Sequence, residues 1–284
     1  MSVKPSRAVL SGFMKKGERS AQPSKFYNRR YYLRHCAGYD QFSLSRIPTL
    51  DDRLRTALSF VHIGKGDAVL DAACGRGELV VHSAQKGARV VGVDFSVDAL
   101  RLTRRLVSYL PPNKKKRVKL IRSDITTLPV GDSTFDAAYF LDIIEHLTQA
   151  EGRIAVREMH RVLKRNGTLI AHTDNWWFIR IFRYILHAIV RLLGGMHVID
   201  DQSIEETGHV TFYTGRGLVR LCQNQGFRDV RLVLPVIENM KQFSVYFRTK
   251  YPGMDAYFLR VSQYLSKTPL YYFASPTIWV VAKK

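Results

Sequence analysis

Cysteine is scarce in this chain of 284 residues: there are three, Cys36, Cys74 and Cys222, and they stand far apart. They form neither the paired pattern of a disulfide scaffold nor the CxxC spacing of a zinc site. We therefore predict no disulfide framework and no metal site, and we expect a cytoplasmic protein. The chain also lacks an apolar run before Lys25 that could form the core of a secretory signal, so we expect no signal peptide.

Acidic residues are also few, with 24 Asp and Glu against 44 Lys and Arg, which gives a formal net charge of +20. Such an excess favours an anionic partner, either nucleic acid or the anionic face of a membrane. It is also compatible with a solvated basic surface, so the net charge alone does not decide between an anionic partner and a surface without one. Hydrophobic residues make up 46% and charged residues 24%, which excludes wholesale disorder and indicates one large globular domain.

The segments of the chain differ in character, and none of them repeats another. Residues 1–25 are polar and basic without periodicity, so we predict a mobile basic tail. Residues 26–284 are predicted to form a single domain. Its parts are an aromatic N-terminal cap at 26–66, a core at 67–174, an apolar lid insertion at 175–210, and C-terminal strands at 211–284 with an insertion at 238–274.

From residue 67, short apolar runs alternate with helical periodicity, which is typical of βαβ units and of a parallel sheet. The predicted strands cover residues 68–71, 89–94, 118–123, 137–141, 167–173, 230–235 and 277–282. The predicted helices cover residues 51–60, 77–85, 97–109, 150–164 and 213–226. The pattern predicts an α/β fold with helices on both faces of the sheet.

A glycine turn follows the first predicted strand, in the sequence VLDAACGRGEL of residues 69–79. Gly75 and Gly77 would let the backbone approach a ligand, but Val80 stands where a dinucleotide-binding GxGxxG loop has its third glycine. Asp71 would repel a pyrophosphate, whereas it suits the cationic amino and sulfonium groups of S-adenosylmethionine (SAM). The charge therefore favours SAM over a nicotinamide dinucleotide.

The next strand ends at Asp94 and Phe95, with Asp94 seventeen residues beyond Gly77. This position would let Asp94 accept hydrogen bonds from both ribose hydroxyls, while Phe95 packs on the adenine face. Each residue also has a simpler interpretation, because an Asp at a strand end can cap the following helix and glycines can serve a tight turn. Together and in this order they favour the cofactor site.

The segments VLDAACGRGEL, VGVDFS, RSDITTLPVGDSTFDAAYFLDIIEHL and VLKRNGTLIAHT resemble the successive motifs of class I SAM-dependent methyltransferases, over residues 66–174. The resemblance implies a seven-stranded, mostly parallel Rossmann-like methyltransferase sheet whose last strand inserts antiparallel. Ala73 departs from the commonest motif, which has glycine there; alanine is similar to what quinone-type methyltransferases carry.

The resemblance also implies a set of cofactor contacts. Asp124 would bind the adenine amino group, the backbone of Ile125 would contact the ring, and Leu141 and Asp142 would lie at the methionine end. The full set of predicted SAM-binding residues is Asp71, Ala73, Gly75, Gly77, Asp94, Phe95, Asp124, Ile125 and Leu141.

Two histidines are candidates for a general base, which methyl transfer needs when the acceptor arrives protonated. His146 follows the fourth strand, at the carboxyl edge where open α/β sheets bind ligands. His172, with Asp174 beside it, shares that edge and ranks second. A histidine that only packs near the cofactor is the alternative for each.

An apolar segment at 176–193 carries Arg180, Arg183, His187 and Arg191 at helical spacing. It could lie peripherally on the inner face of a membrane with its basic stripe at the headgroups, or it could be a lid packed on the protein itself. Both interpretations make the acceptor pocket apolar, so we predict O- or C-methylation of a small or lipid-like acceptor. The alternatives are an RNA methyltransferase that uses the basic run at 114–117, and a SAM-fold binding protein without transferase activity.

Overall fold

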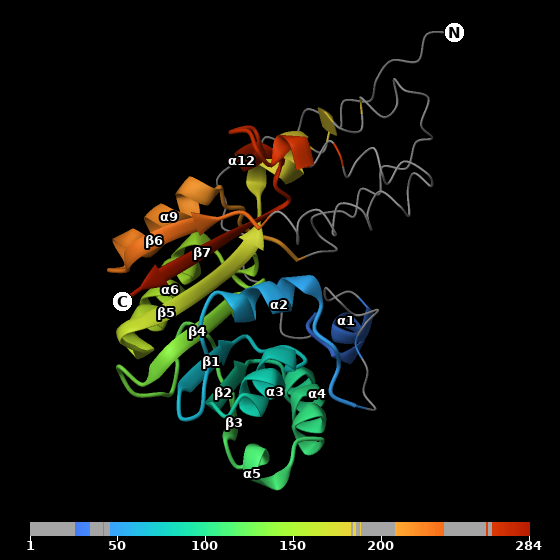
Figure 1. The fold of residues 1–284 in the computed structure, drawn as a ribbon, viewed down its shortest axis with the longest axis vertical. Coiled ribbons are helices and arrows are strands. Elements are labelled where there is room, and N and C mark those ends of the chain that lie inside the picture. Colours follow the sequence, from blue (N-terminus) through green and yellow to red (C-terminus); the bar gives the residue numbers. More distant parts are fainter. Residues whose placement is uncertain are drawn as a thin grey trace.

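The computed structural model describes residues 26–34, 42, 46–182, 184–185, 188, 208–235, 260 and 263–284. The predicted tail at 1–25 and most of the predicted insertion at 238–274 lie outside these residues. In the described part the chain forms a seven-stranded sheet in the order β3-β2-β1-β4-β5-β7-β6 (Figure 1). The strands are β1 Ala68–Ala72, β2 Arg89–Asp94, β3 Val118–Arg122, β4 Phe135–Leu141, β5 Leu163–Asp174, β6 Arg228–Val233 and β7 Thr277–Lys283.

The seventh strand runs against the others. β7 pairs antiparallel with both β5 and β6, while the pairs that join β1 to β5 along the sheet are parallel. The mostly parallel sheet with an antiparallel last strand is therefore confirmed. From β1 the chain first continues to β2 and β3 on one side of the sheet and then crosses back to β4 on the other side. Ligands of open α/β sheets bind at such a switch point, beyond the carboxyl ends of the strands.

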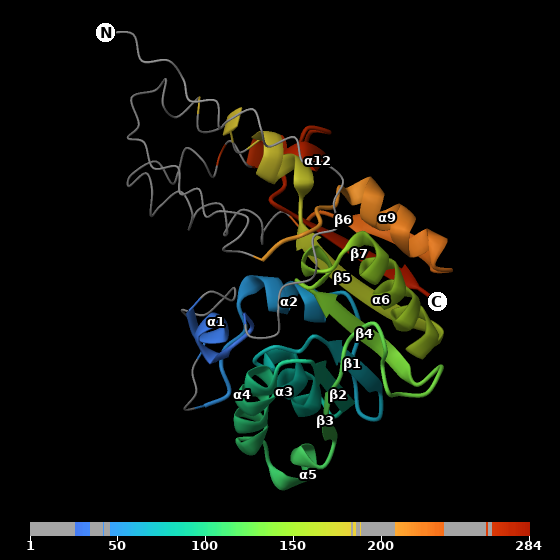
Figure 2. The same cartoon turned by 180° about the vertical axis from the view of Figure 1, so that it is seen from behind.

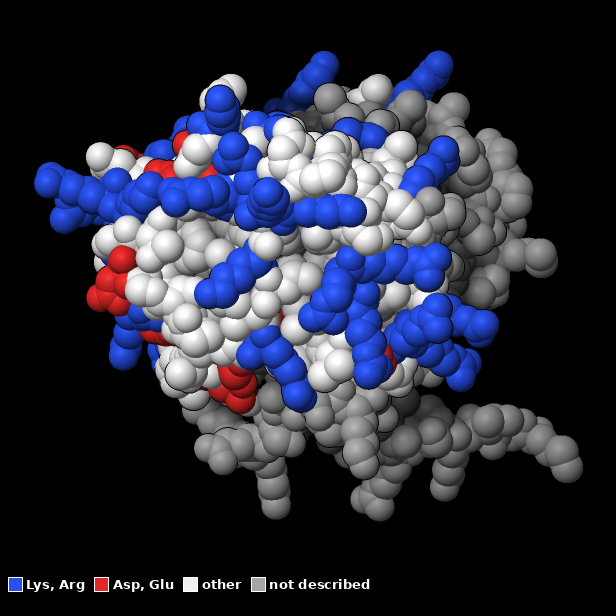
Figure 3. All heavy atoms as spheres, turned by 90° about the horizontal axis from the view of Figure 1, so that it is seen from below, with Lys and Arg blue, Asp and Glu red and all other residues white. Residues whose placement is uncertain are grey.

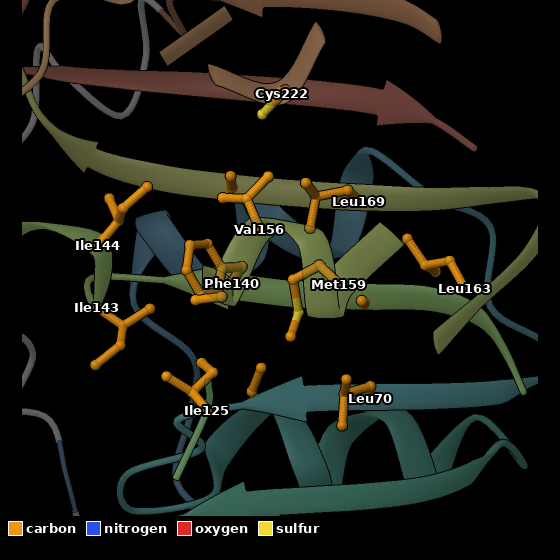
Figure 4. Close-up of a cluster of buried hydrophobic side chains, with 14 of the residues drawn as sticks. Leu70, Ile125, Phe140, Ile143, Ile144, Val156, Met159, Leu163, Leu169 and Cys222 are labelled. Carbon is orange, nitrogen blue, oxygen red and sulfur yellow. The ribbon is translucent and has the colours of Figure 1, made fainter. Parts of the chain in front are cut away.

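Helices cover both faces of the sheet (Figures 1 and 2). On one face lie α2 Asp52–Ser59, α3 Glu78–Gln85 and α4 Val97–Ser108, and on the other lie α6 Gln149–Val162 and α9 Gly215–Asn224. Phe140 and Leu169 of the sheet pack with Val156 and Met159 of α6 (Figure 4). The central strands are buried on both sides, which explains why their sequences are apolar without alternation.

Short local signals fix where the helices begin. Ser96 and Thr214 cap α4 and α9 with their side-chain oxygens, and Thr148 and Glu151 form a reciprocal capping box at α6. Five shorter elements complete the described chain. They are α1 Arg29–Arg34, α5 Pro112–Lys115, the 3-10 turn η2 Ile144–His146, the π-helical turn η3 Phe178–Phe182, and α12 Tyr271–Ala274.

The predicted helix at 176–193 is described only in its first part, and there it contains a π-helical turn at Phe178–Phe182. Trp177 packs edge-on against Phe273 of α12, with ring centroids 5.2 Å apart. Ile181 and Ile185 are exposed. Arg183, His187 and Arg191 lie outside the described residues, so the basic stripe and the lid stay predictions. Within the described ranges, no helix combines the length and apolar character that crossing a bilayer requires.

Candidate SAM site

Two adjoining hollows open at the carboxyl ends of β1, β2 and β4. The residues common to both linings are Tyr27, Ala73, Asp94, Phe95, Ile143 and His146. These shared residues join the two hollows into one site.

The loop between β1 and α3 requires left-handed backbone at three positions. Gly75 has φ +52° and Gly77 has φ +87°, and Ala73 adopts φ +61° where the resemblance leads one to expect glycine. Alanine pays a strain cost there, of the kind that persists at functional sites. Gly77 belongs to neither of the two described linings. Close packing against α4 requires glycine at this position, because a Cβ atom would lie 2.3 Å from Cγ2 of Thr103.

Asp94 joins the glycine loop to the end of β2. Its carboxylate accepts hydrogen bonds from the backbone N–H of Gly75 at 2.9 Å and of Ser96 at 2.8 Å. Burial raises the pKa of Asp94 to about 6, against the opposing effect of these N–H donors. The carboxylate thus holds the glycine loop in place and also forms part of the wall that the two hollows share.

Asp71 is buried at the end of β1 and lines the first hollow. Burial is the main cause that raises its pKa to about 8; the carboxylates of Glu78 and Asp94 raise it further and the Arg53 guanidinium lowers it. A cation bound in this hollow would stabilise the ionised form of Asp71. The site is therefore suited to a cationic ligand.

The second hollow extends past Asp124 and Ile125, which lie after β3. Oδ1 of Asp124 accepts hydrogen bonds from the N–H and the hydroxyl of Thr126, both at 2.7 Å. These bonds orient the carboxylate in the lining of the second hollow.

The comparisons with known proteins agree with this geometry. The sequence profile of a family described as a methyltransferase domain matches residues 69–167. A ubiquinone/menaquinone biosynthesis C-methyltransferase, UbiE, of Syntrophotalea carbinolica is 30% identical over 172 residues, which cover 57% of this chain and 69% of that protein. The chain belongs to the class I SAM-dependent methyltransferases.

Other relatives are more distant or longer. A 2-phytyl-1,4-naphtoquinone methyltransferase of Nostoc is 27% identical, over 60% of this chain and 76% of its own. The chain spans 46% and 64% of the length of two further curated relatives. Among solved structures, a geranyl diphosphate methyltransferase in complex with GPP and sinefungin has a TM-score of 0.57 at 17% identity, over 81% of this chain and 76% of that one. This structural likeness concerns the fold.

At the end of β4, the methyltransferase domain holds an acid in an unusual conformation. Asp142 lines the first hollow beside Leu141 and has φ +52°, in the left-handed region. It forms an ion pair with Arg53 of α2, and its Oδ1 lies 2.5 Å from Nδ1 of His172. Burial would raise the pKa of Asp142, but Arg53 and His172 hold it well below its usual value. Asp142 is therefore a fixed anion.

The two candidate bases lie at different depths. His146 lines both hollows and stacks edge-on against Tyr27, with ring centroids 5.7 Å apart. His172 is buried behind Asp142 and belongs to neither lining within the described chain. The structure thus brings His146 to the site, whereas His172 can reach it only through Asp142.

The N-terminal segment forms part of the pocket wall. Tyr27, Tyr31 and Tyr32 line the first hollow, although the sequence identified them only as part of an aromatic cap. The hydroxyl of Ser96 donates to the carbonyl of Tyr27 at 2.7 Å, and Arg76 donates to the carbonyl of Tyr32 at 3.2 Å. Both anchors lie in or beside the cofactor motifs, so the cap is fastened to the site it covers.

Sequence reasoning missed Arg53 as a residue of the site. It lies in α2, before the first motif, and nothing in its local sequence distinguishes it from the other arginines of the chain. The remaining predicted SAM-binding residues, apart from Gly77, line one or both hollows.

Proposed function

We propose that this protein transfers a methyl group from SAM to a small apolar or lipid-like acceptor, by O- or C-methylation. One observation carries the proposal: Asp71 lines the first hollow, Asp94 the wall common to both hollows, and Asp124 the second. This is the order that SAM's cationic, ribose and adenine groups require. In this arrangement Asp71 holds the ammonium group, Asp94 the ribose hydroxyls and Asp124 the adenine amino group. Family membership supports this orientation.

SAM supplies an electrophilic methyl group on a sulfonium centre. The protein's task is to hold the acceptor atom in line behind that methyl group, and orientation of this kind supplies much of the acceleration. His146, which lines both hollows, is placed to accept a proton from an acceptor that must lose one.

Quinone precursors head the list of acceptors. The names of two relatives refer to quinone substrates, and a structural neighbour is named for geranyl diphosphate, an isoprenoid. Apolar and aromatic side chains, among them Tyr27, Leu141 and Ile143, line the first hollow together with His146. These surfaces suit an apolar ring or chain better than a charged polymer.

The RNA alternative has less support. Figure 3 shows a surface on which Lys and Arg outnumber Asp and Glu, seen from the side where α5 lies in Figure 1. The run Lys114–Arg117 lies in α5 and just before β3, at the amino end of that strand. The hollows open at the carboxyl ends, so this run does not flank their mouth.

We propose further that the protein binds peripherally to anionic membranes. The exposed apolar residues Ile181, Tyr184 and Ile185 after β5 and Leu270 before α12 support this, together with the exposed charge of Arg180. An acceptor dissolved in the bilayer would then be within reach of the enzyme.

The test is methyl transfer from labelled SAM into separate lipid, RNA and protein extracts. Label in the lipid extract, and less of it with Asp94→Ala protein at limiting SAM, is the expected result. Label confined to RNA would favour the RNA methyltransferase. SAM binding without label in any extract would favour a SAM-fold protein that does not transfer methyl groups.

A further inference from the structure

Three side chains with metal-binding atoms meet beside the site: Glu145, His146 and His209. One carboxylate oxygen and one ring nitrogen from each histidine all lie within 4.8 Å of one another. Glu145 and His146 are buried on η2 after β4, and His209 lies in the segment that leads to α9. Ligand atoms on a zinc ion with bonds of about 2.0–2.2 Å are about 3.4 Å apart, so small side-chain rotations would close this set around an ion.

Glu145 and His146 each have a hydrogen-bond partner outside the set of three, and His209 has a carboxylate nearby. Nδ1 of His146 lies 3.2 Å from the carbonyl of Gly208, Nδ1 of His209 lies 3.7 Å from Oδ2 of Asp174, and Glu145 accepts a hydrogen bond of 2.8 Å from the hydroxyl of Thr173. Metal-ligating histidines almost always hydrogen-bond one ring nitrogen to a carbonyl or carboxylate, as His146 does with Gly208, which directs the other nitrogen at the metal.

The backbone holds the distant histidine in register with the other two residues. The N–H groups of Val210 and Thr211 both donate to the carbonyl of Glu145, at 2.8 and 3.0 Å. The hydroxyl of Thr211 donates to the carbonyl of Leu147 at 2.6 Å. The loop that carries His209 is thus fastened to the turn that carries Glu145, and the three groups are organised before any ion arrives.

We propose that Glu145, His146 and His209 bind a zinc ion, with the fourth coordination position open toward the hollows that His146 lines. Two imidazoles and one carboxylate are a donor set typical of zinc sites with an open position, whereas magnesium and calcium prefer oxygen ligands. The charge of the surroundings agrees, because Oδ2 of Asp174 lies 3.7 Å from Nδ1 of His209, and a bound cation would offset the negative charge of Asp174 and Glu145.

The role of the ion rests on the proposed function. The open position would take a water molecule or an oxygen atom of the methyl acceptor, and zinc would stabilise negative charge on that oxygen. His146 would then act as a zinc ligand and not as a base. Zinc would lower the pKa of the bound hydroxyl, and its proton would pass to solvent water.

The experiment uses the full chain, stripped of metal by dialysis against a chelator and titrated with zinc in competition with a zinc indicator dye. We expect one tightly bound zinc per chain. Loss of an outer partner typically weakens metal binding about 10–100-fold, so Thr173→Val should show a loss of this size and His209→Ala a larger one. The matched control is His160→Ala, because His160 packs on Phe227 of another part of the fold.

Cobalt substitution identifies the ligands independently. The expected spectrum of the cobalt-loaded protein has the visible bands of four-coordinate nitrogen and oxygen ligation, and His209→Ala should change them. A sulfur-to-cobalt charge-transfer band would place the metal on a cysteine and overturn the proposal. So would zinc affinities of Glu145→Gln and His209→Ala equal to that of the wild type, or the absence of stoichiometric binding by the wild type. Thermal melts of the metal-free variants verify that they fold.

These readouts do not depend on methyl transfer. If zinc binds as expected but no extract is methylated, the zinc site stands and the proposed function fails. If methylation proceeds in the metal-free protein, the zinc site has no part in the reaction, and a zinc titration still decides whether it exists.

Discussion

Asp94 serves two purposes, because one carboxylate both accepts the N–H of Gly75 and faces the site. Asp94→Ala should weaken SAM binding by about 1–3 kcal/mol, the usual cost of leaving buried hydrogen-bonding groups without their partner. Calorimetric titration with SAM measures this. Asp132→Ala is the matched control, because Asp132 is exposed and pairs with Arg161 away from the site. Unchanged affinity in Asp94→Ala would remove the ribose assignment.

The raised pKa of Asp71 predicts a pH dependence of SAM binding. Below its pKa of about 8 the buried acid of the free protein holds a proton, and the bound ammonium group of SAM favours the ionised form. Binding should therefore release a proton, and the affinity should rise with pH until about 8 and then level off. Measurements above pH 7 separate this effect from Asp94, whose pKa is about 6.

Calorimetry in buffers of different ionisation enthalpy counts the released protons. The wild type should show a buffer-dependent heat at pH 7 to 8, and Asp71→Asn should not. A buffer-independent wild type would contradict the assignment of Asp71 to the ammonium group. The raised pKa of Asp71 also affects the stability of the ligand-free protein. The folded state holds the Asp71 proton more tightly than the unfolded state does, so the contribution of Asp71 to stability falls as pH rises from about 3.8 to about 8.

His146→Ala should lower turnover much more than it weakens SAM binding, since His146 lies at the wall shared by the two hollows. Loss of a group that handles the acceptor's proton typically costs about 10²–10⁴-fold in rate. Single-turnover rates and SAM titrations of the same protein measure the two effects. His160→Ala should leave both unchanged, and an unaltered rate in His146→Ala would reduce His146 to a packing residue.

At the scale of elements, the start of α3 depends on Gly77. Its φ of +87° is unfavourable for any other residue, and a Cβ atom would lie 2.3 Å from Thr103 Cγ2. Gly77→Ala should therefore lower the free energy of unfolding by about 1–3 kcal/mol or more. Chemical denaturation measures it against Gly131→Ala, an exposed glycine whose nearest neighbour to a Cβ atom is 3.6 Å away. Equal stabilities would contradict the packing argument.

The regular elements could be predicted because their signals are local. β2 was predicted at its observed bounds, and α3, α4 and α6 began within one residue of the prediction, since apolar periodicity and capping residues lie in the same short stretch of sequence. The π-helical turn at Phe178–Phe182 was missed, because its apolar spacing resembles that of an ordinary helix.

The site could be predicted where a motif encodes it and not where the fold assembles it. Asp71 and Asp94 stand at strand ends, which the sequence locates. Arg53 reaches Asp142 across 89 residues, and His209 stands 63 residues after His146. Such contacts are created by the packing of distant elements, so no spacing rule along the chain could have found them.

At the scale of the whole molecule, the net charge of +20 bears on location. The protein should sediment with anionic vesicles and not with neutral ones. Each Lys or Arg near such a surface contributes about 1 kcal/mol, and salt screens it over about 8 Å, so binding should weaken with salt without vanishing. The variant Ile181→Ser/Ile185→Ser should bind more weakly, with Ile154→Ser as the control at another exposed position.

Failure of the wild type to bind anionic vesicles at low salt would end the membrane proposal. Equal binding by the double variant would show that attachment is purely electrostatic and that the apolar segment after β5 takes no part.

The hydrogen bonds that hold the N-terminal cap bear on the rate of cofactor exchange. Tyr27 and Tyr32 line the first hollow, and their carbonyls accept hydrogen bonds from Ser96 and Arg76, which stand in the predicted SAM-binding motifs. Under the proposed function, exchange of spent cofactor for fresh SAM involves the contacts that keep the cap in place. The residence time of the cofactor would then depend on the N-terminal segment, and a slow exchange there would limit the turnover rate however fast the methyl group moves.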